Sequence, residues 1–339
     1  MKNLYLHIGA HKTGTSAIQT FLALNRNYLK GKKICYPGNK DVHHDIVKTF
    51  NNSAISGSNT KFIMDQYINQ IKKSNCKTVI FSSEGFIKLA YDDILALKNY
   101  LNNFETKIVY YVRRQDERLE SGYNQIIREK DRRYTNKISI NFIHSKRSHR
   151  LDYYHLLSSW REIFGQENII VRVYENEQLQ DGIFQDFLNI LGLELDDNFL
   201  LPGNEVNKSF NWDIIEIIRL CNSHFKDDFK FHLFLIKSLE NVNLGKNGKK
   251  QYLLSPQQRR EVIAHYADSN AKVAREYLGR EDGRLFYAPL PDLDEPWEPY
   301  EGLTVEKCVP IFMQMLYNMD QKYQRKMQNT LIKQKRKKI

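Results

Sequence analysis

The first stretch that could do chemistry is GAHKTGTS, residues 9–16, a loop rich in glycine and hydroxyl side chains. A loop of this kind between a strand and a helix presents backbone N–H groups and a helix dipole to an anion. Loops that grip a nucleoside triphosphate read G-x-x-x-x-G-K-[ST], with the lysine directly after the second glycine. Here that position is Thr15, and the lysine is Lys12. The loop therefore predicts a site for a short phosphate group, not a β/γ pair; a turn that binds nothing is the alternative.

A second segment, KIVYYVRRQDERLES at residues 107–121, places an arginine directly after an apolar strand. Arg113 follows the expected strand, and Ser121 lies eight residues further along the expected helix. An arginine can bind a phosphate through charge-assisted hydrogen bonds, and a serine can add its hydroxyl. Taken singly, Arg113 is more often a surface ion-pair partner and Ser121 an ordinary helix residue. Taken with the glycine loop, both are expected at the same edge of one sheet.

The elements that must position these residues are short apolar runs separated by helical patterns. Strands are expected at residues 4–8, 33–36, 78–82, 107–112 and 169–174. Apolar residues at helical spacing follow the glycine loop and precede the last of these strands. Alternation of strands and helices predicts an α/β fold, a P-loop-type parallel sheet flanked by helices on both faces. Ligands of such sheets bind at the carboxyl ends of the strands.

After about Asp196 the pattern contains helices only, which predicts an all-helical C-terminal portion. One helix is expected to open at SPQQ with Ser255 as its N-cap, and Gly279 is expected to close it. Pro310 should break or kink the next helix. The expected organisation is a core at residues 1–195, a helical extension at 196–330 that packs on the core, and a basic tail at 331–339.

The pair HKTGTS and KIVYYVRRQDERLES resembles the sulfotransferase family that uses 3'-phosphoadenosine 5'-phosphosulfate. The resemblance implies that residues of the first motif hold the 5' end of this donor and that residues of the second hold its 3'-phosphate. The residues carried over by position are Lys12, Thr13, Gly14, Thr15 and Ser16 for the 5' end, and Arg113 and Ser121 for the 3' end. The unusual lysine position is then explained, because the donor has no β/γ-phosphate to reach.

Further segments, LLSSWREIFGQENIIVRVYENEQ and DFLNILGL, are similar to bacterial carbohydrate-type members of that family. The resemblance covers roughly the first 195 residues. It implies transfer of a sulfuryl group to an acceptor hydroxyl, on a carbohydrate such as a polysaccharide or glycolipid, with adenosine 3',5'-bisphosphate as product and no metal. A third family element is only loosely matched by LGKNGKKQ, residues 244–251.

The acceptor hydroxyl needs a general base, while lysine and backbone donors neutralise the charge that develops on the leaving group. Related families place a catalytic His or Glu at the end of the strand before the arginine-bearing one, which here indicates Glu84 after TVIFSS. Lys12 and Glu84 are thus the expected catalytic residues. A solvated carboxylate at a helix N-terminus is the alternative for Glu84. His43 and His44 are alternative bases, and a metal site at these two histidines lacks further ligands in the sequence.

Composition narrows the class of partner. The chain has 339 residues and a formal net charge of +11, so its field should attract anions. Four widely spaced cysteines without a C-x-x-C pair argue for unpaired thiols in a reducing compartment. With no apolar leader and no long apolar span, a cytoplasmic, soluble protein is expected. The sequence contains no recognised nucleic-acid motif, so no nucleic-acid partner is expected.

Two basic segments could extend the site. Residues 128–150 contain eight Lys or Arg and two acids, which is typical of a solvated face and could also accept an anionic glycan. The tail at Lys333–Lys338 should be disordered and dispensable for catalysis, and could touch an anionic membrane weakly.

Two other classes of protein stay open at this point. A P-loop kinase of a small molecule or sugar would share the fold, but it needs the lysine after Gly14 and a magnesium-binding aspartate. A non-catalytic binder of nucleic acid or of a membrane surface would fit the net charge alone.

Overall fold

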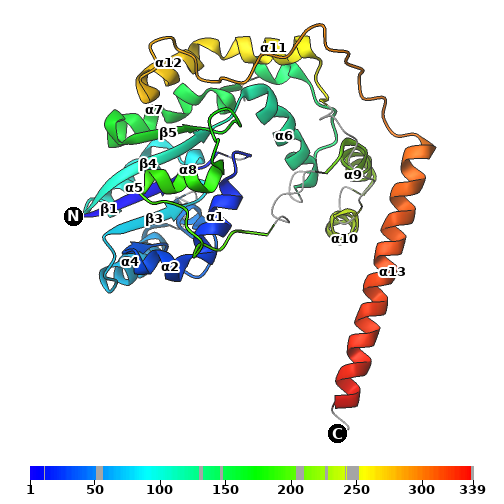
Figure 1. The fold of residues 1–339 in the computed structure, drawn as a ribbon, viewed down its shortest axis with the longest axis horizontal. Helices are drawn as coiled ribbons and strands as arrows, with labels where there is room; N and C mark the ends of the chain where they lie inside the picture. Colours follow the sequence, from blue (N-terminus) through cyan, green and yellow to red (C-terminus); the bar gives the residue numbers. More distant parts are fainter. Residues whose placement is uncertain are drawn as a thin grey trace. The chain divides into compact units, whose positions relative to one another are not determined.

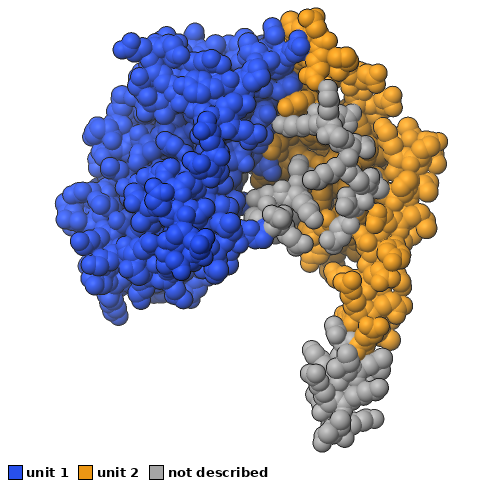
Figure 2. Space-filling view, viewed as in Figure 1, with its two compact units in different colours: residues 1–118, 140–207, 258–292 blue, residues 119–139, 208–257, 293–339 orange. Residues whose placement is uncertain are grey.

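The structure, a computed structural model, describes residues 1–10, 12–50, 56–129, 133–145, 148–203, 210–225, 228–240, 242 and 252–336. The chain divides into two compact units (Figure 2). The first comprises residues 1–118, 140–207 and 258–292, and the second comprises residues 119–139, 208–257 and 293–339. The segment 258–292, expected in the helical extension, therefore belongs to the unit that contains the sheet.

The first unit is built on one parallel five-stranded sheet in the order β2-β3-β1-β4-β5 (Figure 1). The strands are β1 (Lys2–His7), β2 (Ile34–Cys35), β3 (Thr78–Ser82), β4 (Phe104–Val112) and β5 (Ile169–Val173). All neighbours pair in parallel, with Leu6 of β1 opposite both Phe81 of β3 and Ile108 of β4. Each predicted strand is present, and the α/β fold class is confirmed.

Both faces of the sheet are covered, because side chains alternate along each strand. Leu4 and Leu6 of β1 pack in a core with residues of helices α3, α4, α5, α7 and α12. Val109 and Tyr111 of β4 point to the opposite core, shared with helices α1, α2 and α8. The apolar runs are therefore buried on both sides, as parallel strands between helical layers require.

The helices of this unit either connect its strands or, for the last three, follow β5 (Figure 1). They are α1 (Thr15–Leu24), α2 (Arg26–Gly31), α3 (His44–Phe50), α4 (Ser56–Lys72), α5 (Tyr91–Tyr100), α7 (Tyr153–Phe164), α8 (Gly182–Ile190), α11 (Pro256–His265) and α12 (Ala267–Leu278). Helix α6 (Gln115–Arg128) begins in this unit and continues into the second. Short 3-10 turns lie at Phe86–Lys88, Ile140–His144, Ser148–Leu151 and Gln166–Asn168.

The second unit is helical in its described residues. It contains α9 (Trp212–His224), α10 (Phe229–Leu239) and α13 (Val305–Arg336), with the end of α6. Its core joins Ile127 of α6, Ile214 and Ile218 of α9, Leu239 of α10 and Ile311 of α13. This agrees with the all-helical C-terminal portion expected from the sequence. No described helix in the chain is long and apolar enough to cross a membrane.

Three details of the C-terminal portion differ from the expectation. The helix opening at Pro256 ends at His265, and a second helix follows, which Gly279 closes in a left-handed conformation as predicted. Pro310 lies inside a continuous helix, so it does not break α13. The helix also continues through Arg336, so the basic tail up to that residue is helical, where a disordered segment was expected.

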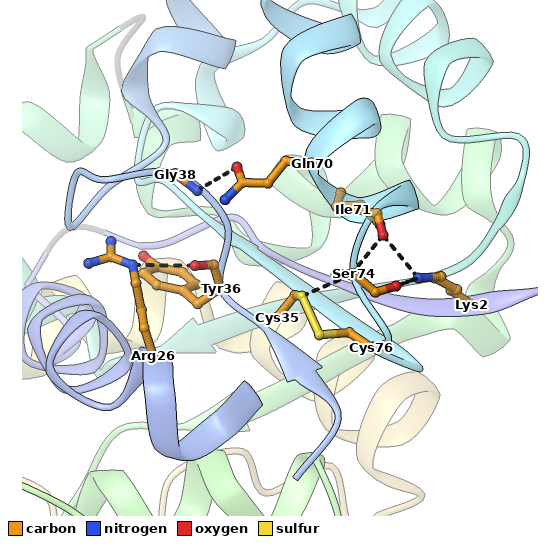
Figure 3. The surroundings of a disulfide bond; sticks show 9 residues. All are labelled: Lys2, Arg26, Cys35, Tyr36, Gly38, Gln70, Ile71, Ser74 and Cys76. Atoms are coloured by element: carbon orange, nitrogen blue, oxygen red, sulfur yellow. Dashed lines mark hydrogen bonds between the residues drawn. A yellow bond between two sulfur atoms is a disulfide. The ribbon is translucent and has the colours of Figure 1, made fainter. Parts of the chain in front are cut away.

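The expectation that the cysteines stay unpaired is wrong for one pair. Cys35 and Cys76 form a disulfide with their Cα atoms 5.8 Å apart (Figure 3). Cys35 ends β2 and Cys76 precedes β3, and the parallel pairing of these strands brings together residues that are 41 positions apart. The spacing of the cysteines could not show this contact. The argument for a reducing compartment therefore loses its basis.

Candidate active site

The glycine loop joins the end of β1 to the start of α1, as expected. Its described residues include three with positive φ, namely Gly9 at 102°, Lys12 at 68° and Gly14 at 75°. A Cβ on Gly14 would lie 2.9 Å from the ring of Tyr174, so a larger residue would force a shift. Lys12 adopts this backbone without glycine's freedom, which costs on the order of 1–3 kcal/mol and is typical of functional loops. The loop therefore holds Lys12 in a defined position at a cost in stability.

The hydroxyls of two loop threonines have their acceptor within the loop itself. Thr13 and Thr15 are buried, and both hydroxyls donate to the Ala10 carbonyl, at 2.7 and 2.6 Å. They hold the loop in shape. Gly14 caps α1 without a side-chain hydrogen bond, and the half-buried Ser16 lies in the first turn. Amides of a first helical turn lack acceptors within the helix, so they are the donors that this loop can offer to an anion.

Arg113 lies against the loop. Its Nη1 donates to the Lys12 carbonyl at 3.1 Å, and its guanidinium lies 5.6 Å from the ring centroid of Tyr174. Its Nε and Nη2 donate to one carboxylate oxygen of Glu117, at 3.0 and 2.9 Å. The two sequence motifs therefore meet at the carboxyl edge of the sheet, as predicted. Glu117 thus takes up two of the N–H donors of the Arg113 guanidinium.

The neighbouring Arg114 has a different role. It is buried and pairs with the fully buried Asp116, which also accepts from Arg259. Its Nη1 donates to the Pro289 carbonyl at 2.7 Å. Arg114 is thus part of a buried ion-pair cluster that ties α6 and α11 to the 289 segment.

Ser121 lies on α6, the helix that begins two residues after Arg113, and it is half-buried. It belongs to the second unit, whereas Arg113 belongs to the first. The meeting of Arg113 and Ser121 at one phosphate therefore stays a prediction. The loosely matched segment at residues 244–251 lies outside the described residues, as does His11.

Glu84 lies in the turn after β3, directly beside the loop. A Cβ built on Gly9 would lie 3.2 Å from the Cα of Glu84, so the two backbones pass closely. The Ser83 amide donates to the His7 carbonyl at 3.1 Å, which fixes the turn to the end of β1. Glu84 is half-buried. The carboxylate expected to act as base is therefore carried by the element next to the lysine loop.

The two alternative bases differ sharply. His43 is buried among the rings of Tyr36, Tyr67 and Phe81. Its Nδ1 accepts from the Ser82 amide at 3.1 Å and its Nε2 donates to the Pro37 carbonyl at 2.8 Å. Burial lowers the pKa of His43 to about 4. With both ring nitrogens used, His43 is structural and cannot serve as a base or a metal ligand without losing these bonds.

His44 begins α3 and is exposed. Its Nδ1 lies 2.6 Å from the hydroxyl oxygen of Ser83, the residue before Glu84. The same hydroxyl accepts from the Gly85 amide at 3.1 Å. His44 therefore lies at the Glu84 turn, and it remains the alternative base of the two histidines.

His7, at the end of β1, contacts the last residue of β3 next to the site. The Ser82 hydroxyl oxygen accepts from Gln19 at 3.1 Å and lies 2.8 Å from His7 Nδ1. His7 Nε2 is buried with no hydrogen-bond partner among the described residues. Burial lowers the pKa of His7 to about 4, while the negative charge of Glu84 opposes this shift. His7 is thus a neutral residue that joins the ends of β1 and β3.

Two residues of the site had not been predicted from the sequence. Glu117 binds the guanidinium of Arg113 one helical turn into α6, and Tyr174 places its ring between Arg113 and Gly14. The signal for Tyr174 was its place directly after β5, at the functional edge. The signal for Glu117 was the i, i+4 spacing to Arg113.

A separate polar cavity of about 350 Å³ lies along β5, next to α8. Two of its arginines already have partners, since Arg172 pairs with Asp186 and Arg280 donates to Gln178 and to the Leu285 carbonyl. The lysine loop and Glu84 do not line it. The cavity is therefore distinct from the candidate site.

The fold and the site define an α/β protein with a P-loop-like strand, loop and helix at the carboxyl edge of its sheet. No protein-family model matches the chain. An uncharacterized protein of Archaeoglobus fulgidus is 30% identical over 202 residues, 59% of this chain and 54% of that protein, so the chain spans about half of the relative's length. A sulfotransferase from Alicyclobacillus acidocaldarius superposes with a TM-score of 0.40 and 15% identity, over 83% of this chain and 97% of that one.

Proposed function

We propose that the protein transfers the sulfuryl group of 3'-phosphoadenosine 5'-phosphosulfate to an acceptor hydroxyl, with a carbohydrate as the acceptor class. The observation that carries the proposal is the hydrogen bond from Arg113 to the Lys12 carbonyl, which joins the two sequence motifs of the family resemblance at one sheet edge. The strained Lys12 backbone and the adjoining Glu84 turn support it.

The loop would bind the 5' end of the donor. Amides of the first turn of α1 and the Lys12 ammonium would surround the phosphosulfate, and the close packing of Gly14 on Tyr174 holds that turn in place. Arg113 would turn its fork from Glu117 to the 3'-phosphate, helped by Ser121. The Arg113–Glu117 pair thus keeps the guanidinium placed until a dianion replaces the carboxylate.

The reaction requires one proton transfer and one displacement at sulfur. Glu84 would accept the proton of the acceptor hydroxyl as its oxygen bonds to sulfur, and the bond from sulfur to the bridging oxygen breaks. Lys12 would neutralise the charge that develops on that oxygen, which leaves as part of adenosine 3',5'-bisphosphate. These two residues lie on adjacent turns, which is the arrangement that such a displacement needs.

Ligand-induced stabilisation tests the donor. We expect adenosine 3',5'-bisphosphate to raise the free energy of unfolding by about 2.7 kcal/mol at a hundredfold excess over its dissociation constant, without added metal. ADP, which lacks the 3'-phosphate, should stabilise less at equal concentration. Equal stabilisation by ADP, or stabilisation only with magnesium, would favour the kinase alternative.

Lys12 can be tested against a matched lysine. Lys33 also has a positive φ, 61°, but it precedes β2 at the opposite end of the sheet. Lys12→Ala should lower turnover with a hydroxyl acceptor by roughly 100-fold or more, whereas Lys33→Ala should leave turnover unchanged. Equal losses in both variants would indicate a stability effect and remove Lys12 from the chemistry.

A further inference from the structure

The C-terminal helix α13 carries an apolar stripe that the protein leaves exposed. The residues of this stripe recur at alternating spacings of four and three and are Val305, Val309, Phe312, Leu316, Met319 and Tyr323. Their exposed fractions include 72% for Val305, 54% for Leu316 and 62% for Tyr323. Apolar residues at this spacing are typical of a helix that pairs with another helix.

The packing of α13 within its own unit does not use this stripe. The helix contacts the core of the second unit through Ile311, which is fully buried, and through Met315. At 3.6 residues per turn the stripe is centred roughly 120° around the helix from Ile311, with Val309 and Leu316 farthest from it and Met319 nearest. In Figure 1, α9 and α10 lie beside the N-terminal part of α13, and the rest of the helix continues past them. The stripe is thus a second apolar face.

The two ends of α13 carry opposite charges. Residues 292–306, which lead into the helix, contain six acidic and no basic residues. Residues 322–338, at its other end, contain eight basic and no acidic residues. A parallel pair of such helices would place like charges together, whereas an antiparallel pair places the basic end of each beside the acidic end of the other.

We propose that the exposed stripe of α13 binds the same stripe of a second copy of this chain, in an antiparallel pair. The alternating apolar spacing supplies the contact, and the opposite charges of the two ends set the direction. An anionic membrane would attract the basic end and repel the acidic one, so it matches only half of the surface. The inference is independent of the sulfotransferase proposal.

The oligomeric state tests the surface. The full chain should be a dimer by sedimentation equilibrium at micromolar concentration. Leu316→Glu places a charge near the centre of both helices and should weaken dimerisation by about 100-fold, since it buries unpaired like charges. Phe62→Glu, at a residue that is 59% exposed on α4, is the matched control and should leave the dimer intact. A monomeric full chain, or a Leu316→Glu dimer of unchanged affinity, would overturn the proposal.

Cysteine cross-linking tests the direction, in a Cys221→Ser, Cys308→Ser background because these two cysteines are free. A mixture of Val305→Cys and Tyr323→Cys chains should form a mixed disulfide dimer on oxidation. Val305→Cys alone should not cross-link efficiently, because the two 305 positions lie at opposite ends of an antiparallel pair. Efficient cross-linking of Val305→Cys alone would show a parallel pair and contradict the inference.

A lipid membrane is the alternative occupant of the stripe, and vesicle binding tests it. In flotation with vesicles of phosphatidylcholine and phosphatidylserine, the unsubstituted chain and Leu316→Glu should bind to the same extent. Vesicle binding that depends on Leu316, by a chain that sediments as a monomer, would assign the stripe to a membrane. Binding through the basic end alone should be removed by moderate salt and should not respond to Leu316→Glu.

Discussion

At the amino ends of the strands the protein is tied together by covalent and hydrogen-bonded cross-links, whereas at the carboxyl ends it gathers charged side chains around a glycine-rich loop. Near the amino ends, Lys2 donates to the carbonyls of Ile71 and Ser74, and the Cys35–Cys76 disulfide joins β2 to the segment before β3 (Figure 3). At the carboxyl ends lie the left-handed Lys12 and the Arg113–Glu117 pair.

The difference indicates that stability and function are divided between the two ends of one sheet. Covalent and hydrogen-bonded ties at the amino edge stabilise the unit without touching the loop. Strain at the carboxyl edge can persist because the surrounding structure holds it, as in other functional loops. Changes at one end should therefore alter stability alone, and changes at the other should alter binding or rate.

The largest effect should come from the carboxyl edge. Glu84→Gln removes the base while keeping the shape of the side chain, so turnover should fall about 10²- to 10⁴-fold with little change in nucleotide affinity. His44→Gln, at the other available base of the same turn, is the control and should retain most of the activity. If the His44 variant lost the rate and the Glu84 variant kept it, the base would be His44. Loss of nucleotide binding in Glu84→Gln would make Glu84 a structural residue of the loop.

At the amino edge, removing the disulfide should reduce stability alone. For a closed loop of about forty residues, the loss of the cross-link should lower the free energy of unfolding by about 3–4 kcal/mol. The double variant Cys35→Ser, Cys76→Ser should show this loss in urea unfolding while its affinity for adenosine 3',5'-bisphosphate stays the same. Weaker nucleotide binding in that variant would show that the two ends are coupled.

The buried histidines predict a pH dependence that belongs to the fold. His43 has its pKa lowered to about 4 by burial, from about 6.5 in the unfolded chain. Between these values the unfolded state binds a proton that the native state does not, so stability falls as pH decreases from about 6.5 to 4, by about 3 kcal/mol for this residue. His43→Gln should flatten this slope, measured by urea unfolding at several pH values, and His44→Gln should not. An unchanged slope in His43→Gln would assign the titration to other groups such as His7.

The strands and the functional edge could be predicted because they depend on local patterns. Apolar β-branched runs give the strands, and parallel topology then brings Lys12, Glu84 and Arg113 to one edge. The inward-turned hydroxyls of Thr13 and Thr15 could not be predicted, because they depend on where the Ala10 carbonyl lies in the folded loop. The roles of distant partners, such as the Cys35–Cys76 bond, depend on strand pairing between residues far apart in the sequence.

The smallest expected effect separates two adjacent arginines. Arg113→Ala should weaken the binding of adenosine 3',5'-bisphosphate by about 10- to 100-fold, because it removes charge-assisted hydrogen bonds. The affinity for adenosine 5'-phosphosulfate, which lacks the 3'-phosphate, should fall much less. Calorimetric titration of both ligands gives the ratio of the two losses in affinity. Because Arg113 also holds the Lys12 carbonyl, some loss for both ligands is expected, and only the difference reports the 3'-phosphate. Arg114→Lys, in the buried cluster with Asp116, should lower stability and weaken both ligands equally or not at all. Equal losses of the two ligands in Arg113→Ala would show that this arginine positions the loop and does not bind the 3'-phosphate.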